Sequence, residues 1–331
     1  ICRQGHIRFV LRWLDDSMSK NVIVGNGCGV FSAFLNFFSW MSVSDYNDID
    51  VSLHVCNKTH DWNNCLTTPE NPYIRSSQFD RSILSKNVLS EIFVHGDYIK
   101  MRYDYPEQFI FLEHYPELFH NCLEYYPRDV LKYSGKGGMT QVYQDTNHLE
   151  LNRKVFNDQW NKLSFRKKFQ ERVDEEEKLI EGKKVLSVML RTIYHYVDPS
   201  TGKVATEDAA PAFIQGAVKN VRDRMGDYDA VLLTTQNQPY IDAFVKEFGE
   251  DCIFTDRPRF EDFNDWRGVG KDTYELTDEK YQKEVEDCLL DVILTSKSDH
   301  ILGTCSNMFL GALSMNTKNT CELIQEQFWG A

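Results

Sequence analysis

From residue 182 onward, short apolar runs alternate with longer amphipathic runs, and this alternation constrains the fold more than any other feature of the sequence. Four continuous apolar runs predict buried strands: Val185 to Leu190, Ala230 to Leu233, Cys252 to Thr255 and His300 to Leu302. Four runs with helical spacing predict helices: Ala210 to Met225, Pro239 to Phe248, Glu284 to Leu294 and the residues after Asn307. Strands that alternate with helices are typical of a parallel sheet covered on both faces. We therefore expect an α/β fold here.

The first half of the chain carries a weaker version of the same pattern. Asn21 to Val24 and Asp50 to Cys56 predict strands. Between them a glycine-rich turn, which contains Gly27 and Gly29, leads into an apolar run from Phe31 to Trp40 that predicts a helix. The charged run from Asn157 to Glu181 predicts another helix, and we place the boundary between two domains near residues 160 to 184.

Composition limits the classes of function. The 331 residues are enough for two domains or one large α/β unit, and 42% apolar residues support a packed core. A formal net charge of −13 argues against a phosphate-backbone binder, so we expect no nucleic-acid partner. The nine cysteines lie scattered without the spacing of a zinc site, so we expect no zinc.

The cellular location stays open at this point. No apolar run is long enough to cross a bilayer and no signal-peptide pattern is present, so we expect no membrane association of this sequence. The first residue is Ile1, which leaves a removed membrane anchor possible. An odd number of cysteines favours the cytoplasm, whereas the triplet Asn57-Lys58-Thr59 is compatible with a secretory lumen.

Three of the four predicted strands in the second half end in polar residues. The first runs into Arg191, the second into Thr234-Thr235-Gln236-Asn237, and the fourth into Thr304-Cys305-Ser306-Asn307. Ligands of open α/β sheets bind beyond the carboxyl ends of the strands, and a helix N-terminus with an arginine beside it suits a phosphate. We expect an anion site at this edge; in the alternative interpretation, Ser306 only caps its helix.

The same residues carry a resemblance to a known family. Val188 to Arg191 ends a strand in an arginine, and Leu233 to Asn237 ends the next in a polar cluster. Leu289 to Asp299 (LLDVILTSKSD) then leads into the serine-bearing turn Gly303 to Asn307. From Val185 to Met315 the sequence resembles the donor domain of GT-B fucosyltransferases, which include enzymes that modify N-glycan cores and rhizobial nodulation factors.

The resemblance implies a GT-B architecture, in which two Rossmann-like domains face each other across a cleft and the C-terminal donor domain contains a parallel sheet. It implies an acceptor-side domain over residues 1–165 and a nucleotide-sugar domain over residues 166–315. Residues 316–331 would form a C-terminal helix that returns toward the first domain, and Cys321 to Trp329 has a helix-like pattern. The turn with Gly27 and Gly29 is similar to the family's first glycine turn.

The activity implied is inverting, metal-independent transfer of a sugar, L-fucose from GDP-fucose, onto a glycan hydroxyl, with no cofactor. Arg191 would stabilise the departing diphosphate in place of a metal. The donor-binding residues would be Gly27, Gly29, Arg191, Thr234, Thr235, Gln236, Asp291, Thr304, Ser306 and Asn307. The catalytic base would come from the first domain, with His95 and Asp97, or Glu113 and His114, as candidates.

Departures from the family pattern leave alternatives open. Met189 stands where the family has histidine, and Gln236-Asn237 replaces a pair of aspartates. A related transferase that uses another nucleotide sugar, or a catalytically inactive relative that binds sugar or nucleotide, would also fit. Asp48-Ile49-Asp50 has the pattern of a metal-binding motif in another glycosyltransferase fold, but it precedes a strand, which is the wrong side for a ligand. The absence of GxGxxG and GxxxxGK[ST] motifs argues against a dehydrogenase or a phosphoryl-transfer enzyme.

Overall fold

The computed structural model describes residues 21–25, 31, 34, 35, 38, 50–54, 73–75, 88–94, 108–110, 146–191, 210–261, 278–304 and 306–324. The chain divides into two compact units. Unit 1 comprises residues 1–169 and 273–285, and unit 2 comprises residues 170–272 and 286–331. Each unit is described by itself below.

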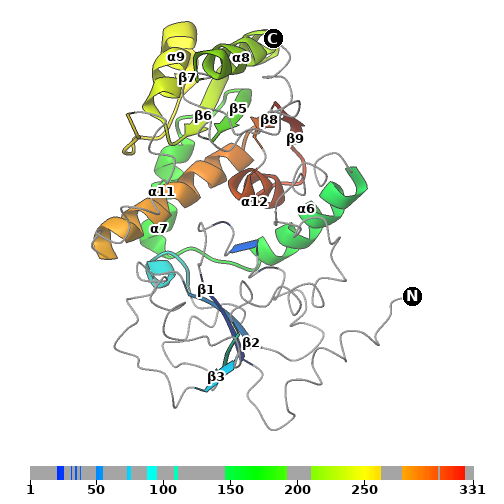
Figure 1. Cartoon of the computed structure of the whole chain (residues 1–331), viewed down its shortest axis with the longest axis vertical. Helices are drawn as coiled ribbons and strands as arrows, with labels where there is room; N and C mark the ends of the chain where they lie inside the picture. Colours follow the sequence, from blue (N-terminus) through cyan, green and yellow to red (C-terminus); the bar gives the residue numbers. More distant parts are fainter. Residues whose placement is uncertain are drawn as a thin grey trace. The chain divides into compact units, whose positions relative to one another are not determined.

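Unit 2 is built on a parallel sheet of five strands in the order β7-β6-β5-β8-β9 (Figure 1). The strands are β5 (Val185–Leu190), β6 (Ala230–Thr235), β7 (Cys252–Ile253), β8 (His300–Gly303) and β9 (Thr320–Leu323). Every neighbouring pair is parallel. The four strands that the apolar runs predicted are confirmed, and together with the intervening helices they make this unit an α/β fold.

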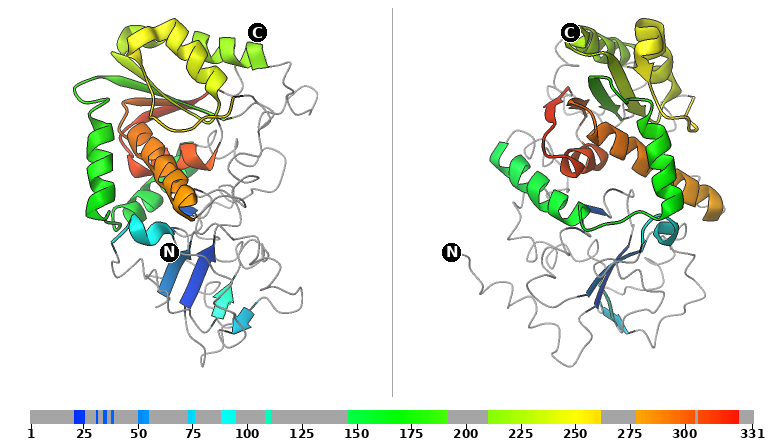
Figure 2. Two further views of the ribbon diagram at one scale, coloured as in Figure 1. Left: turned by 90° about the vertical axis from the view of Figure 1, so that its left-hand side faces the viewer. Right: turned by 180° about the vertical axis from the view of Figure 1, so that it is seen from behind.

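Helices cover both faces of this sheet. α8 (Ala210–Arg222) and α9 (Gln238–Phe248) lie on one face, and α12 (Asn307–Met315) lies with part of α11 (Asp278–Ser296) on the other (Figure 2). All four helices were predicted, α12 from an apolar run, and α11 begins earlier in the chain than expected. Strand–helix alternation thus gives the three layers that a parallel sheet requires to bury both of its faces.

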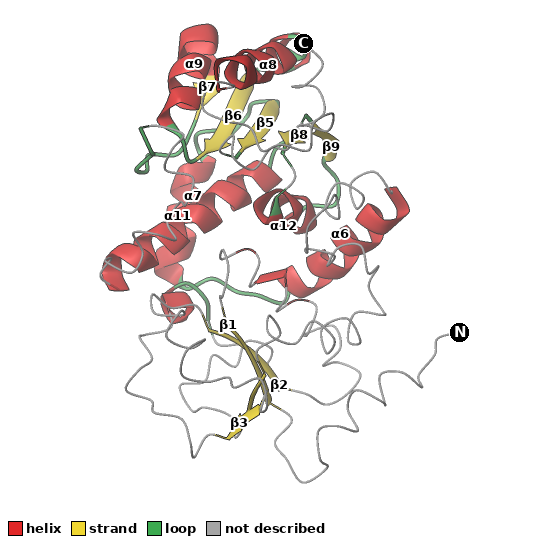
Figure 3. Ribbon diagram, viewed as in Figure 1, coloured by secondary structure: helices red, strands yellow, loops and turns green. Residues whose placement is uncertain are grey.

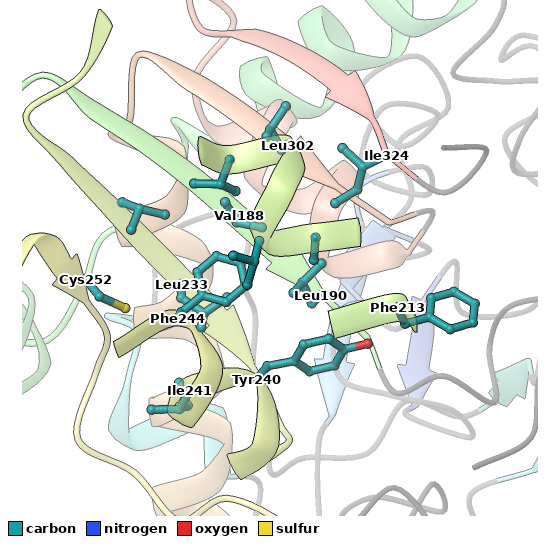
Figure 4. Packing of buried hydrophobic residues seen from close by; sticks show 14 of the residues in the cluster. Val188, Leu190, Phe213, Leu233, Tyr240, Ile241, Phe244, Cys252, Leu302 and Ile324 are labelled. Carbon is teal, nitrogen blue, oxygen red and sulfur yellow. The ribbon is translucent and has the colours of Figure 1, made fainter. Parts of the chain in front are cut away.

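The face toward α8 and α9 carries a large apolar cluster. Alternate residues of the strands point to it, because side chains along a strand project to opposite faces in turn. Leu186, Val188 and Leu190 of β5 meet Phe213 of α8 and Phe244 of α9 in one buried cluster (Figure 4). Burial of apolar surface stabilises a fold by about 25 cal/mol for each Å², so this cluster contributes to the stability of the unit.

The opposite face of the sheet mixes apolar and polar side chains. Val185 and Leu232 pack there against Leu294 of α11. Ser187 and Thr234 on the same face carry hydroxyl groups, which are paired with the hydroxyl groups of Ser298 and Thr295. Burial of a hydroxyl group is unfavourable unless it is hydrogen-bonded, so this face fixes the register of α11 more strictly than an apolar face would.

The expected C-terminal helix does not begin at Cys321. Thr320 to Leu323 instead forms β9, which pairs in parallel with β8, and the backbone N–H of Ile324 donates to the Gly303 carbonyl at 3.1 Å. The helix-like pattern was overridden because β8 would otherwise leave its backbone groups unpaired along that edge. Residues beyond 324 lie outside the described part of the chain.

Unit 1 contains two small sheets. β1 (Asn21–Gly25) pairs in parallel with β2 (Asp50–His54), and β3 (Tyr73–Arg75) pairs antiparallel with β4 (Gln108–Ile110) (Figure 3). The two strands predicted in this part of the sequence are therefore confirmed. The unit also contains a short 3-10 helix, η3 (Val88–Glu91), and the α-helix α6 (Thr146–Trp160).

An aromatic cluster forms the described core of unit 1. Phe31, Phe34 and Phe38 are helical and buried, as the apolar run predicted. Phe34 packs edge-on against Phe93 with ring centroids 5.8 Å apart, and Phe93 packs in the same way against Trp160 of α6 at 6.4 Å. Aromatic pairs in this geometry add about 0.5–1.5 kcal/mol each beyond the area that they bury.

The charged run after Asn157 does not form the single helix that was expected. α6 ends at Trp160 and a second helix, α7 (Lys167–Glu177), begins after a break at residues 161–166. In the break, the Val94 N–H donates to the Ser164 carbonyl at 2.8 Å, and the Arg166 N–H donates to the Ile92 carbonyl at 2.7 Å. In residues 164–166, pairing with residues 92–94 replaces helical hydrogen bonds. The periodicity of the sequence could not reveal this pairing, because the two segments lie far apart in the chain.

The end of β8 depends on a glycine that has no room for a side chain. A Cβ atom on Gly303 would lie 2.9 Å from the Cγ of Phe309 and closer still to two other ring carbons. Phe309 is fully buried in α12, so its ring has no space to withdraw. Absence of a side chain at residue 303 is therefore what brings α12 against the end of β8.

We predict that Gly303→Ala lowers the free energy of unfolding by about 1–3 kcal/mol, because the Phe309 ring must move out of a packed core. Denaturant unfolding of the purified variant measures the change. Gly226→Ala is the matched control, since a Cβ atom there meets nothing within 4 Å. Equal effects of the two substitutions would contradict the proposed close packing.

Candidate functional site: the carboxyl edge of the five-stranded sheet

The carboxyl ends of β7, β6, β5 and β8 lie side by side because all four strands are parallel neighbours. We call the residues that follow these strands the carboxyl edge. Arg191 follows β5, Gln236 follows β6, and Thr304 follows β8. The structure therefore brings together the three strand ends that the sequence singled out.

One hydrogen bond joins Arg191 to Thr304 across the edge, and a second joins Thr304 to β5. The backbone N–H of Arg191 donates to the Thr304 Oγ1 at 3.2 Å, and the backbone N–H of Thr304 donates to the Met189 carbonyl at 3.1 Å. Thr304 is buried, whereas Arg191 is half-buried. The threonine hydroxyl thus fixes the position of the Arg191 backbone at the end of β5.

Ser306 caps α12. Its backbone is extended, with φ −158° and ψ 159°, and its hydroxyl oxygen accepts the Phe309 N–H at 3.1 Å. The structure therefore confirms the capping role that the sequence suggested for this serine. Asn307 is the first residue of α12, where backbone N–H groups lack partners within the helix. The start of α12 thus carries both a cap and the partial positive charge of the helix dipole.

The end of β6 carries two buried threonines. The Thr234 Oγ1 lies 3.0 Å from the Oγ1 of Thr295 on α11, and the Thr235 Oγ1 accepts the Asn237 N–H at 3.3 Å. Gln236 is half-buried, and its carbonyl accepts the Phe260 N–H at 2.8 Å. Both threonine hydroxyls are therefore engaged within the protein, and the half-buried Gln236 is the residue of this group that is open to solvent.

Asp291 lies on α11 and is buried, with a side chain 2% exposed. Its Oδ1 accepts a hydrogen bond from the Thr255 hydroxyl, and its Oδ2 pairs with the Arg257 Nη2 at 2.5 Å. The Arg257 side chain is itself only 9% exposed. Both carboxylate oxygens are thus bonded to residues that follow β7, so this aspartate orients its neighbours.

The residues after β7 were not among the strand ends that the sequence analysis used. Arg257 and Arg259 are both held at the carboxyl edge: the Arg257 Nη2 donates to the Thr235 carbonyl at 3.3 Å, and the Arg259 Nη2 donates to the Thr255 carbonyl at 2.9 Å. The signal that could have found them is a pair of arginines, in Asp256-Arg257-Pro258-Arg259, directly after a buried strand.

Further charged groups surround α11 within unit 2. Arg172 on α7 pairs with Glu286 and with Asp287, the latter at 2.8 Å. Burial raises the pKa of Glu176, an effect that Arg172 opposes and that the negative charges of Asp291, Asp287 and Asp256 reinforce. Carboxylates and guanidinium groups therefore alternate along this side of α11, where low exposure strengthens their interactions.

Four of the expected site residues, Gly27, Gly29, His95 and Asp97, lie outside the described residues. Within the described part of the chain, no group of three or more His, Cys, Asp or Glu side chains is arranged to hold a metal ion. Among the helices that the structure describes, none is both long and apolar enough to span a membrane.

No protein-family model matches the sequence, and no curated protein matches it. Solved structures do match. The crystal structure of fucosyltransferase NodZ from Bradyrhizobium has a TM-score of 0.50 at 11% identity, over 91% of this chain and 94% of that chain. NodZ α-1,6-fucosyltransferase soaked with GDP-fucose gives 0.49 at 10% identity, over 90% and 93%. POFUT1 in complex with GDP gives 0.44 at 9% identity, over 92% and 98%.

The match to the Bradyrhizobium enzyme shows the fold. The α/β class with a parallel sheet in the C-terminal half is confirmed, and the chain has the GT-B fold of fucosyltransferases. At this level of identity the match supports the fold alone, so the roles of individual residues rest on the geometry of the carboxyl edge.

The ion pair between Asp291 and Arg257 generates a stability prediction. Asp291→Asn leaves the Arg257 guanidinium buried without its carboxylate, and we expect the free energy of unfolding to fall by about 3–5 kcal/mol. Chemical denaturation measures it. Asp223→Asn, which removes one partner of the exposed pair between Lys219 and Asp223, serves as the control and should leave stability unchanged. A loss no larger than that of the control would mean that the buried pair contributes nothing.

Proposed function

We propose that the chain is an inverting, metal-independent glycosyltransferase that moves a sugar from a nucleoside diphosphate onto a glycan hydroxyl, with L-fucose from GDP-fucose as the donor. The comparison that supports this function is the match in fold to the fucosyltransferase NodZ from Bradyrhizobium. The observation that carries the proposal is the hydrogen bond from the Arg191 N–H to the Thr304 hydroxyl, because it holds an arginine beside the start of a helix.

The donor diphosphate would bind between these two positive groups. The planar guanidinium of Arg191 matches two phosphate oxygens at once, and the amide hydrogens at the start of α12 match another. In this proposal Thr304, Ser306 and Asn307 shape that helix start, and Gly27 and Gly29 are also proposed as donor-binding residues. No cofactor is involved.

The buried polar residues would position the site. Thr234 is bonded to Thr295, and Asp291 to Thr255 and Arg257, so their polar atoms are already engaged. Thr235 likewise holds the backbone at Asn237. We therefore assign donor contact at the end of β6 to Gln236 and assign Thr234, Thr235 and Asp291 the role of fixing the edge that Gln236 and Arg191 occupy.

The proposed reaction is a single displacement. The acceptor hydroxyl oxygen forms a bond to the anomeric carbon as the bond from that carbon to the diphosphate oxygen breaks, so the configuration inverts. The bonding electron pair leaves with the diphosphate, whose growing negative charge Arg191 stabilises without a metal ion. The hydroxyl proton passes to a base, for which His95 or Asp97 remains the proposal.

One structural observation favours a second candidate function. The residues that end β6 present an amide, Gln236, and a buried Asn237, with no carboxylate at this strand end. A site without that charge could bind a nucleotide sugar and fail to turn it over. The second candidate is therefore an inactive relative that binds nucleotide or sugar, and a turnover measurement separates it from an enzyme.

A donor screen tests the proposed function directly. We expect the protein to release GDP from GDP-fucose, faster when glycan acceptors are present, and at an unchanged rate when EDTA is added. Release of UDP from UDP-sugars, with no release of GDP from GDP-fucose, would contradict GDP-fucose as the donor. Loss of nucleotide release when EDTA is added would contradict metal independence. Binding of GDP without any release would favour the inactive relative.

Arg191→Lys tests the role of the arginine. Lysine keeps the positive charge and loses the two-point contact with phosphate, so we expect kcat to fall by about a hundredfold or more, with an unchanged melting temperature. Steady-state kinetics with GDP-fucose measures the change. Arg222→Lys is the control, because Arg222 pairs with Glu247 on the exposed side of unit 2 and should keep full activity. Full turnover by the Arg191 variant would remove it from the site.

A further inference from the structure

Two arginines follow β7 at the carboxyl edge, and one of them, Arg257, is paired with a carboxylate. Arg257 pairs with Asp291 and donates to the Thr235 carbonyl. Arg259 donates only to oxygens of its own turn: the Arg257 carbonyl at 2.6 Å, the Thr255 carbonyl at 2.9 Å and the Thr255 hydroxyl at 3.3 Å. Among the described residues, no carboxylate forms an ion pair with Arg259. Arg257 and Arg259 thus carry two positive charges against the one negative charge of Asp291, and the carboxylates of Asp287 and Asp256 also act on Arg259.

Both guanidinium groups keep a buried donor that is not used. The Nε atoms of Arg257 and Arg259 are buried, and neither has a hydrogen-bond partner. A buried donor on a charged group is unfavourable when it has no partner, and a bound anion is one way in which such a donor becomes satisfied. Two such donors on adjacent cations favour an anionic ligand over a purely structural role.

The charge on Arg259 persists at neutral pH. Burial, together with the neighbouring charge of Arg257, lowers the pKa of Arg259 to about 10. The side chain is thus cationic under ordinary conditions, and an anion bound beside it would relieve the electrostatic cost that lowers this pKa.

The two arginines lie at the same edge as Arg191. Arg257 bonds the carbonyl of Thr235, the last residue of β6, and Thr235 is the register partner of Leu190, which directly precedes Arg191. Neighbouring strands are about 4.8 Å apart. The Arg257 guanidinium is therefore within reach of a ligand, the size of a diphosphate with its attached groups, that also contacts Arg191.

We propose that Arg257 and Arg259 form a second anion-binding element of the carboxyl edge, which binds phosphate oxygens of a nucleoside diphosphate together with Arg191. Asp291 and Thr255 act as positioning residues that hold the two guanidinium groups in place. The identity of the ligand as a nucleoside diphosphate rests on the proposed function, whereas the affinity for a phosphate anion does not.

The competing explanation is that Arg259 only braces its turn through the carbonyls of Thr255 and Arg257. That role predicts an effect on stability without an effect on anion binding. Calorimetric titration of the folded protein with inorganic pyrophosphate, GDP and guanosine separates the two explanations, since guanosine shares the base and ribose of GDP and lacks the phosphates.

We expect Arg259→Gln to weaken binding of both pyrophosphate and GDP by about tenfold to a hundredfold, the range for loss of a charged hydrogen bond, and to leave guanosine binding unchanged. The control is Arg222→Gln, which removes an equal charge from the exposed pair with Glu247 and should change none of the three affinities. Arg259→Lys retains the charge without the fork and should give an intermediate loss for pyrophosphate.

Unchanged pyrophosphate affinity in Arg259→Gln, with a lowered melting temperature, would overturn the proposal in favour of the bracing role. If the Gln variant does not fold, wild-type affinity for pyrophosphate in Arg259→Lys overturns the proposal equally.

Failure of the anion site and failure of the proposed transferase function give different results. If pyrophosphate binding depends on Arg259 but no sugar is released, the proposed transferase function is contradicted and the anion site is supported. If Arg191→Lys loses GDP binding and Arg259→Gln does not, the proposed transferase function stands and the proposed anion site is contradicted.

Discussion

The hydrogen bond from the Arg191 N–H to the Thr304 hydroxyl is the interaction on which the functional edge depends. β5 is the central strand of the sheet and is followed directly by Arg191, and the turn after β8 leads into α12. The bond therefore connects the strand that precedes the arginine to the turn that precedes the helix. Gly303 allows Phe309 to pack against the strand end, and Ser306 caps the helix. Each of these residues holds the backbone at the end of β5 or at the start of α12. Together they fix the positions of the Arg191 backbone and the N-terminus of α12.

The two faces of the sheet divide the work of folding and function. The face toward α8 and α9 is apolar throughout its buried cluster and supplies cohesion. The face toward α11 buries hydroxyl pairs, Ser187 with Ser298 and Thr234 with Thr295, and then the Asp291 carboxylate. These groups are tolerable in the interior only because each has a partner, and the same pairing aligns α11 with the carboxyl edge. The Asp291 carboxylate in this polar row pairs with Arg257 at the carboxyl edge.

The sequence was sufficient for the parallel sheet because Val185–Leu190 and Ala230–Thr235 are mostly apolar and are buried on both faces, which is the pattern of central parallel strands. It was insufficient for β9, whose pairing with β8 overrides local helical spacing, and for the break after Trp160, whose backbone partners lie far away in sequence. Both errors arise from contacts between residues distant in the chain.

The site shows the same division. Convergence of Arg191 with Thr304 followed from strand ends meeting at one edge, and the capping role of Ser306 followed from its residue type and position. The engagement of Asp291 by Thr255 and Arg257 could not be foreseen, because it depends on how α11 is rotated against the sheet. Arg257 and Arg259 were overlooked because the two-residue strand β7 gave too little pattern to draw attention to the turn that follows it.

Hydrogen exchange of the backbone amides with and without GDP is the most direct measurement of the central claim. The account predicts that GDP slows exchange in peptides that span residues 189–191, 255–260 and 304–310, which lie along the carboxyl edge. Peptides at the opposite end of the strands, around residues 183–186 and 298–300, should exchange at the same rate in both states. Protection confined to the opposite end, or no protection by GDP anywhere, would contradict a donor site at this edge.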